Sequence, residues 1–568
     1  MKKLNLIFFV LIIPASFSVK SCQKKDKIIE GQNITVDSGM VVSAHPQSSR
    51  IGVGILLKGG NAIDAAVATE FALAVCYPEA GNIGGGGFML IRKSDGSTDV
   101  IDYREKAPSR SVRDMYLEKS GNVAVGMSTE THLACGVPGT VDGMINTHSK
   151  YGRLPFKEVI QPAIDLAENG FPVTSGQAVD LNSNRELFIS RNAHLPAFVK
   201  DSLWKEGDIL IQRDLAGTLK RIREHGREGF YSGTTARLIV REMRRGNGIL
   251  SEQDLNEYRS VSRSPLTADY KGYKIITLPP PSGGGIILVQ LLKMIEPRPF
   301  AEWGFNSART IHLITEAEKR AFADRSEYPG DPDFIKIPVS QLVNSEYLHR
   351  RMSTFNDNTA SASQDIKPGL PEGYTSEETT HYSVVDGMGN AVSATTTLNN
   401  TFGNSIVADS AGFLLNNEMD DFSIKPGYPN MYGLVGGEAN AVQPGKRMLS
   451  SMTPSIVEKD GKLLLVLGSP GGSTIPTTVF QVVVNVLDFG MNIGQAVDAG
   501  RFHHQWLPDW ISYEKDAIDS LTLERLEEMG HELKQRSALG RINAIMVLPG
   551  GEKTGGADKR GNNSACGY

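Results

Sequence analysis

The order of apolar and polar positions divides the chain into helices and strands along most of its length. Apolar residues three to four positions apart predict helices at 62–75, 155–169, 214–225, 232–245 and 307–325, and Ser251 to Asp254 carries a helix-start signal. Short apolar or β-branched runs predict strands at 88–92, 100–103, 412–415, 463–468 and 543–548. This mixture predicts an α/β protein in which strands and helices alternate.

The stretch from Thr379 to Asn400 predicts a hairpin. Residues 380–385 and 391–397 have the β-branched content of strands, and the residues between them include Asp386 and Gly389, which favour turns. If Val385 pairs with Ala391 in an antiparallel register, Thr379 falls opposite Thr397. Two hydroxyl groups would then lie side by side.

Thr379 is a candidate nucleophile. The segment before it, 356–378, is polar and rich in Ser, Pro and Gly, so it has little to bury. Threonine needs an adjacent base, and an α-amine freed at its own N-terminus, with a pKa of ~7.7 to 8.0, supplies one. Cleavage before Thr379 would create that base. From the hairpin alone, an ordinary threonine-rich strand pair is the simpler interpretation.

The N-terminus has the pattern of an export signal. Lys2 and Lys3 precede the apolar run 4–13, which is too short to span a membrane and predicts a signal peptide over residues 1–21. Residues 19–22 resemble a bacterial lipoprotein box that ends at Cys22, although Lys20 departs from it. We expect a lipidated Cys22 and a membrane-anchored or periplasmic protein, with cleavage and plain secretion as the alternative. No other stretch has the length and apolar content of a membrane helix.

Composition narrows the class of protein. The mature chain exceeds a single ordinary core, which predicts two or more folding units by size. The net charge of −5 is spread over interspersed acids and bases, so no basic face for nucleic acid is expected. Three further cysteines fit neither a disulfide framework nor a zinc pattern, and one disulfide among them stays open: Cys76, Cys135 and Cys566.

Two further motifs suggest ligands but are interpreted as structural. Gly84 to Gly87 lacks the Gly-Lys-Ser/Thr ending and the following helix of a phosphate loop, so these glycines are expected to allow close backbone approach. His503 and His504 are adjacent, so on a strand they would point to opposite faces and grip no common ion.

Several motifs together resemble the γ-glutamyltranspeptidases. They are TTHYS from Thr379, GGNAIDAAVA from Gly59, DYREKAP from Asp102, PPPSGGG from Pro279, ADRSEYPGDPDF from Ala323, NNEMDDF from Asn416, SSMTP from Ser450 and GSPGGS from Gly468. The resemblance implies an N-terminal-nucleophile hydrolase with a four-layer αββα sandwich. It also implies self-cleavage between Glu378 and Thr379 into a large piece, 22–378, and a small piece, 379–568, within one intertwined unit.

The resemblance assigns roles in catalysis. Thr379 would be the nucleophile, Thr397 would orient its hydroxyl, and Gly471 and Gly472 would hold the oxyanion. The last assignment agrees with the local pattern, because both glycines lie where a predicted strand turns into a helix and backbone N–H groups are unpaired. No cofactor is implied.

The resemblance also implies a substrate site for glutathione and other γ-glutamyl compounds, with amino acids or peptides as acceptors. Arg104, Ser450 and Ser451 would bind the α-carboxylate, and Tyr432 would form the wall of a lid over residues 426–437. Asn399, Glu418 and Asp421 would receive the α-ammonium, although many bacterial relatives have glutamine in place of Glu418. No histidine or cysteine completes a metal site beside these acids.

Two alternatives stay open. A related acylase of the glutaryl-cephalosporin type shares the fold and self-cleavage but does not need the acids that would receive an ammonium. An uncleaved binding lipoprotein with the same pocket is the other, although the sequence retains Thr379, Thr397 and both glycines. The last residues, 554–568, depart from the family's usual ending, which leaves the packing of this tail open.

Overall fold

The structure is a computed structural model that describes residues 27–369, 380–436 and 438–568. The predicted nucleophile Thr379, the bond before it, and Cys22 with the signal segment therefore lie outside the described residues. Within those ranges, no helix combines the length and hydropathy needed to cross a membrane.

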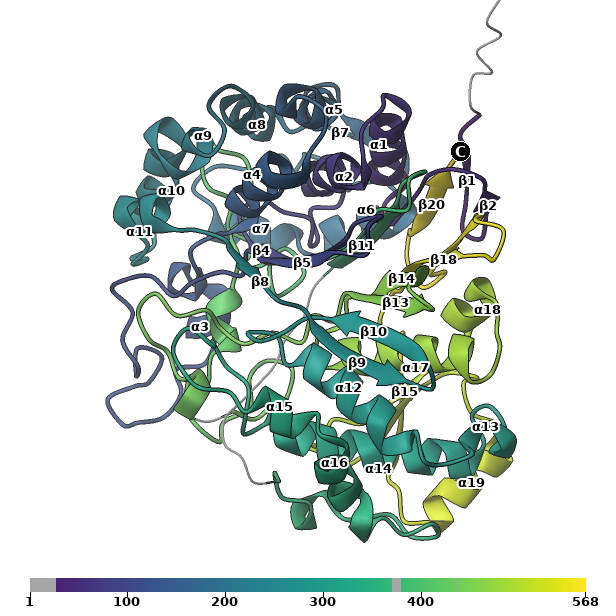
Figure 1. The fold of residues 1–568 in the computed structure, drawn as a ribbon. Helices are drawn as coiled ribbons and strands as arrows, with labels where there is room; N and C mark the ends of the chain where they lie inside the picture. The colour runs from purple at the N-terminus through teal and green to yellow at the C-terminus, as the bar shows by residue number, and fades with distance from the viewer. Residues whose placement is uncertain (1–26, 370–379, 437) are drawn as a thin grey trace, which may run out of the picture.

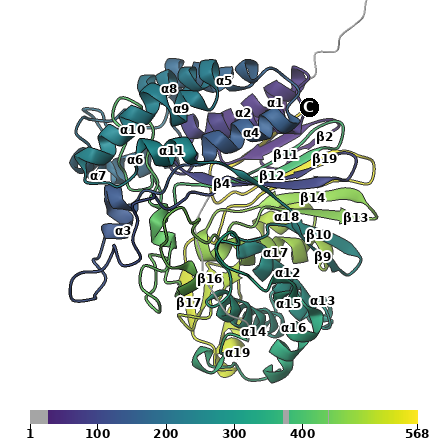
Figure 2. The same ribbon diagram turned by 60° about the vertical axis from the view of Figure 1, so that its left-hand side comes forward.

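Two stacked β-sheets form the centre of the molecule, and helices cover both outer faces (Figures 1 and 2). In the described chain the first sheet has eight strands, in the order β1 (Ile29–Gly31), β20 (Ser564–Gly567), β3 (Met40–Ser43), β11 (Thr380–Val385), β12 (Ala391–Thr397), β4 (Gly86–Arg92), β5 (Thr98–Asp102) and β8 (Val261–Arg263). The second has seven, in the order β2 (Thr35–Val36), β19 (Lys553–Ala557), β18 (Asn543–Val547), β14 (Lys462–Gly468), β13 (Ser455–Lys459), β10 (Tyr273–Thr277) and β9 (Leu266–Tyr270).

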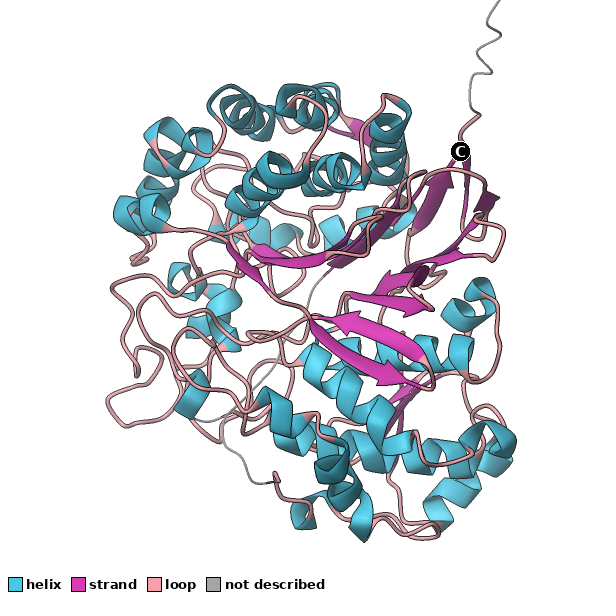
Figure 3. Ribbon diagram, viewed as in Figure 1, coloured by secondary structure: helices cyan, strands magenta, loops and turns pink. Residues whose placement is uncertain are grey.

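The helices divide into two outer layers (Figure 3). Those on the outer side of the first sheet, which share one hydrophobic core with it, are α1 (Pro46–Leu57), α2 (Ala62–Cys76), α4 (Thr140–Tyr151), α5 (Phe156–Asn169), α6 (Ser175–Ser183), α7 (Arg185–Arg191), α8 (Arg213–His225), α9 (Glu228–Tyr231), α10 (Gly233–Arg245) and α11 (Glu252–Glu257). Those on the second are α12 (Gly284–Ile295), α13 (Phe300–Trp303), α14 (Ala308–Arg325), α15 (Val339–Leu342), α16 (Ser345–Arg351), α17 (Ile475–Leu487), α18 (Ile493–Asp498) and α19 (Ser520–Glu528).

Smaller elements complete the fold. They are α3 (Met127–Glu130), the pair β6 (Phe171–Pro172) and β7 (Ile209–Leu210), and a three-stranded sheet of β15 (Phe502–His503), β16 (Ile511–Glu514) and β17 (Leu533–Arg536).

Strand periodicity accounts for the layers. On β3, Met40 and Val42 enter the core between the two sheets, whereas Val41 packs under the outer helices. On β14, Val466 enters the same inner core and its neighbours Leu465 and Leu467 face the second helix layer. Because alternate side chains point to opposite faces, each apolar strand is buried on both sides. The predicted αββα sandwich is confirmed.

Most predicted elements are present within a residue or two of their expected ends, including the capping box at Ser251 that starts α11. The predicted strand at 412–415 is wrong, because this segment makes only an isolated bridge between Val407 and Leu414. Gly412 has a φ of +81°, and a Cβ there would lie 2.3 Å from the backbone nitrogen of Leu215. Close packing against α8 therefore replaces a regular ladder.

The C-terminal tail, whose packing the sequence left open, supplies strands to both sheets. β19 pairs with β18 and β2, and β20 lies between β1 and β3. The cysteines Cys76, Cys135 and Cys566 are buried free thiols.

Candidate active site

The hairpin forms with the predicted register. Val385 pairs with Ala391, and the ladder continues to Thr380 opposite Thr396. The turn is closed by Asp386, whose Oδ1 accepts the amides of Met388 and Asn390 at 2.9 and 3.0 Å. The described ladder thus ends one position short of the predicted Thr379 and Thr397 pair.

Thr397 ends β12 and is fully buried. Its Oγ1 accepts the backbone amide of Asn399 at 2.7 Å, and its carbonyl accepts Nδ2 of Asn82 at 2.7 Å. Asn82 Oδ1 in turn accepts the Gly85 amide at 2.9 Å, so one side chain ties the end of β12 to the glycine run. Asn82 is a positioning residue that the sequence analysis missed. Its position two residues before the glycine run Gly84 to Gly87 was the available signal.

The glycine run is structural, as expected. A Cβ on Gly85 would lie 1.9 Å from the carbonyl oxygen of Thr397, and one on Gly87 would lie 2.3 Å from that of Thr395. Only glycine allows β4 and the preceding loop to approach β12 this closely.

Three buried charged residues from distant parts of the chain meet beyond the end of β5. The Arg104 guanidinium donates to Glu418 Oε1 through Nη1, and to Asp421 Oδ2 through Nη2 at 2.5 Å. Glu418 and Asp421 lie on one turn of 3₁₀ helix, 418–421, and all three side chains have no exposed surface. Glu105 Oε2 also faces Arg104, at 3.3 Å. The structure therefore brings together the predicted carboxylate and ammonium receptors.

This cluster has more acids than bases. Burial raises the pKa of Glu105, Glu418 and Asp421, and the charge of Arg104 opposes that shift. Glu418 Oε2 and Asp421 Oδ1 are buried and accept no hydrogen bond from the described residues. Two adjacent carboxylate oxygens without donors favour a ligand that carries several N–H groups and a positive charge.

Ser450 and Ser451 follow directly after the carbonyls that hold Arg104. Arg104 donates to the carbonyls of Met448 and Leu449, and both serines are fully buried. Ser451 Oγ accepts Nη2 of Arg325 at 3.0 Å. Arg325, at the end of α14, is a second buried guanidinium at this site, and none of the roles predicted from the sequence was assigned to it. Its place in the motif ADRSEYPGDPDF was the available signal.

Gly471 and Gly472 form the turn between β14 and α17. Their φ values are +134° and +60°, and Thr474 Oγ1 donates to the Gly471 carbonyl at 2.7 Å. Among the described residues, neither glycine amide has an acceptor. Two free amides before a helix that begins at Ile475 are suited to bind an anion.

Asn399 connects the ionic cluster to the glycine turn. Its Nδ2 donates to the carbonyl of Asn417 at 3.0 Å, next to Glu418, and its own carbonyl accepts the Tyr432 hydroxyl at 3.1 Å. Asn399 and Gly471 line one cavity of about 340 Å³. The predicted residues Asn399, Tyr432 and Gly471 are therefore neighbours. The described residues do not place them relative to Thr379.

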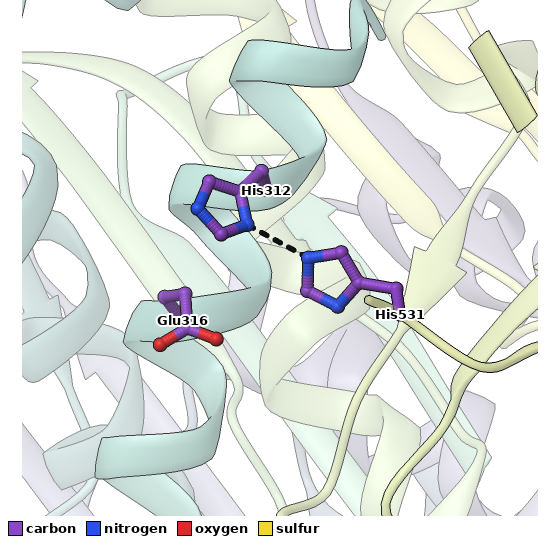
Figure 4. A group of neighbouring side chains, drawn as sticks. All are labelled: His312, Glu316 and His531. Atoms are coloured by element: carbon purple, nitrogen blue, oxygen red, sulfur yellow. Dashed lines mark hydrogen bonds between the residues drawn. The ribbon is translucent and has the colours of Figure 1, made fainter. Parts of the chain in front are cut away.

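The described residues also hold one group with the composition of a metal site, His312, Glu316 and His531 (Figure 4). His312 Nδ1 lies 2.7 Å from His531 Nε2, and His312 Nε2 lies 2.7 Å from the Asn356 carbonyl. Glu316 already pairs with Arg320 at 2.7 Å and Lys319 at 3.2 Å. Because both nitrogens of His312 and both oxygens of Glu316 already have partners and two cations are adjacent, we interpret the group as a structural network.

The adjacent histidines 503 and 504 have separate partners, as their strand position predicted. His503 Nδ1 lies 2.9 Å from Thr477 Oγ1, and His504 Nε2 lies 3.2 Å from Asp509 Oδ1. Burial lowers the pKa of both rings.

Comparison with known proteins identifies the family. The family model described as gamma-glutamyltranspeptidase matches residues 48–568. The chain is 49% identical over 533 residues to the glutathione hydrolase proenzyme of Escherichia coli (strain K12), covering 93% of this chain and 91% of that protein. It is 36% identical to an acylase ACY 1 proenzyme of Pseudomonas sp. (strain V22), covering 94% of this chain and 93% of that one.

Solved structures agree. Cephalosporin acylase from Bacillus halodurans aligns with a TM-score of 0.83 at 26% identity, covering 98% of this chain and 99% of that one. The Helicobacter pylori gamma-glutamyltranspeptidase aligns with a TM-score of 0.57 at 44% identity, covering 59% of this chain and 97% of that one. From the fold, the buried ionic cluster and these matches, this chain belongs to the gamma-glutamyltranspeptidase family.

Proposed function

We propose that this protein is a γ-glutamyltransferase and glutathione hydrolase that matures by cutting itself between Glu378 and Thr379. The observation that carries the proposal is the buried cluster of Arg104, Glu418 and Asp421 with its two carboxylate oxygens that lack donors. The γ-glutamyl group carries an α-carboxylate and an α-ammonium. A ligand of this kind gives its ammonium to the acids and its carboxylate to Arg104, so both charges of the ligand find a buried partner of opposite sign.

Maturation begins with attack of Thr379 Oγ on the carbonyl carbon of Glu378. The peptide C–N bond breaks as an ester forms at Oγ, and the nitrogen takes the proton that Oγ loses, which frees the Thr379 α-amine. Water then hydrolyses the ester, which releases the Glu378 carboxylate and restores the Thr379 hydroxyl. The precursor names of the relatives, such as the Escherichia coli proenzyme, support cleavage of a precursor. The products are the pieces 22–378 and 379–568.

In turnover the Thr379 amine takes the proton from Oγ, which attacks the γ-carbonyl of glutathione while Thr397 orients it. The amides of Gly471 and Gly472 stabilise the oxyanion, and cysteinylglycine leaves with the proton. Arg104, Ser450 and Ser451 hold the α-carboxylate; Asn399, Glu418 and Asp421 hold the α-ammonium. Tyr432 limits access of water to the γ-glutamyl ester. Water or the amine of an amino acid or peptide then accepts the acyl group.

The acylase alternative shares this fold, as the Bacillus halodurans structure illustrates. A glutaryl side chain lacks the α-ammonium, and it gives Glu418 and Asp421 no partner. These buried acids therefore favour the γ-glutamyl substrate. We also propose a location for the protein. The segment 1–21 directs its export, and a lipid on Cys22 anchors it in a bacterial envelope.

Self-cleavage is tested by comparing wild type with Thr379→Ala and Thr379→Ser on a denaturing gel, with N-terminal sequencing of the smaller band. We expect a wild-type fragment that begins Thr-Thr-His-Tyr, slower cleavage of the serine variant and an intact alanine variant. Release of p-nitroaniline from γ-glutamyl-p-nitroanilide should follow the same order. A folded wild-type chain that stays whole would overturn the proposal and favour a binding protein.

A further inference from the structure

The cavity of about 340 Å³ beside Gly471 has a mixed lining that the γ-glutamyl site does not account for. Tyr77 and Glu79 form part of it at the end of α2, and Arg541 and Arg536 come from the C-terminal region. Asp180, on α6, adds a second acid. The cavity therefore combines acidic side chains from the N-terminal half of the chain with arginines from its C-terminal region. It also borders Gly471, in the turn proposed to hold the oxyanion.

Glu79 is the unusual member of this lining. Its side chain is only 5% exposed, and its Oε2 has no hydrogen-bond partner among the described residues. Burial, reinforced by the charge of Asp180, raises its pKa to about 8. A buried carboxylate that keeps an oxygen without a donor is costly unless a ligand supplies one.

Arg541 provides the complementary charge at the exposed rim. Its Nη1 donates to the Tyr77 hydroxyl at 3.0 Å and its backbone amide donates to Ser469 Oγ at 3.0 Å, so the side chain is fixed next to the glycine turn. Its remaining guanidinium N–H groups have no acceptor among the described residues. A fork of this kind is suited to a carboxylate.

We propose that this cavity binds the acceptor of the transfer reaction, an α-amino acid or short peptide, with its ammonium on Glu79 and its carboxylate on Arg541. The inference rests on the proposed function. The bound ammonium gives one proton to the Glu79 carboxylate, and the neutral amine attacks the γ-glutamyl carbonyl. The C–N bond forms, the ester bond to Thr379 Oγ breaks, and Oγ takes the second amine proton. Glu79 then returns its proton to solvent.

The test compares wild type with Glu79→Gln and Arg541→Gln, and uses Glu186→Gln, an exposed site, as the control. The donor is γ-glutamyl-p-nitroanilide, and the acceptors are glycylglycine and its amide, which lacks the carboxylate. We expect the ratio of transfer to hydrolysis with glycylglycine to fall about tenfold or more in both cavity variants, as loss of a charged hydrogen bond predicts. Wild type should prefer glycylglycine to its amide, and Arg541→Gln should remove that preference.

Two results would overturn the proposal: an unchanged ratio in both variants, or equal losses of transfer and hydrolysis. Calorimetric titration of the processed protein with glycylglycine distinguishes failure of the cavity assignment from failure of the proposed function. If wild type hydrolyses no donor but binds glycylglycine, and Arg541→Gln does not, the cavity assignment stands while the proposed activity fails. Absence of binding to wild type contradicts the cavity assignment whatever the activity.

Discussion

Arg104 and Asp421 are 317 positions apart in the chain and are joined by a 2.5 Å ion pair with both side chains fully buried. One residue precedes the proposed cut and the other follows it. The proposed binding site for the γ-glutamyl group therefore takes residues from both proposed pieces, and neither piece contains it alone.

The first prediction concerns this pair. Asp421→Asn removes one of the buried carboxylate charges that Arg104 faces, so kcat/KM for γ-glutamyl-p-nitroanilide should fall by about 30-fold or more, the range for loss of a buried charge partner. Asp420→Asn is the matched control on the same 3₁₀ turn, because its carboxylate accepts Ser128 Oγ at 2.6 Å rather than Arg104. Equal losses in the two variants would contradict the role of Asp421.

The second prediction concerns the glycine turn. Gly471→Ala places a methyl group 2.5 Å from Thr474 Oγ1 at a φ of +134°, so the turn must shift and its amides lose their alignment. We expect kcat to fall by about 10²- to 10³-fold, as for loss of an oxyanion donor. Gly461→Ala, at a φ of +74° with no atom within 4 Å, controls for backbone strain. A fall in kcat of less than tenfold for Gly471→Ala would argue against the assignment.

The third prediction concerns close approach at β12. Gly85→Ala puts a Cβ 1.9 Å from the carbonyl oxygen of Thr397. Because that oxygen belongs to the backbone, the end of β12 must shift to make room. We expect little soluble protein and no cleaved fragment. Gly54→Ala, in α1 with open space around it, should fold and gain up to about 1 kcal/mol of stability. Thermal melting and a gel measure both effects, and normal cleavage of Gly85→Ala would refute the packing argument.

The fourth prediction is a dependence of stability on pH. Burial lowers the pKa of His531 from 6.5 to about 3, so between these values the unfolded chain binds more protons than the folded one. The stability associated with the neutral ring is complete above pH 6.5 and is lost as the pH falls through that window.

His531→Gln tests this dependence, because the variant keeps an N–H donor without titrating. Its melting temperature should fall less steeply than that of wild type between pH 7 and pH 4. His194→Gln, at an exposed histidine, should follow the wild-type curve. Parallel curves for wild type and His531→Gln would show that this ring does not contribute.

The sequence predicts local geometry well and long-range burial poorly. The hairpin register followed from strand periodicity and the five-residue turn, both of which are local. The pairing of β20 between β1 and β3 joins opposite ends of the chain, so no local sequence pattern predicts it.

The same limit applies to the site. The apolar spacing of 307–325 predicts the helix that carries Arg325, but the burial of this arginine depends on the packing of α14 against the segment at Ser451. Glu79 likewise gives no signal in sequence, because its importance depends on a cavity lined by residues from several hundred positions away.

The interleaved order of strands has a consequence for the life of the mature enzyme. β11 and β12 lie between β3 and β4, so the proposed cut leaves two polypeptides that share continuous backbone ladders. Folding of the precursor is unimolecular, whereas recovery of a denatured mature enzyme requires two chains to meet. A low protein concentration should therefore reduce the renaturation yield of the processed enzyme but not that of the precursor. The cut makes refolding bimolecular, and refolding does not restore the single chain.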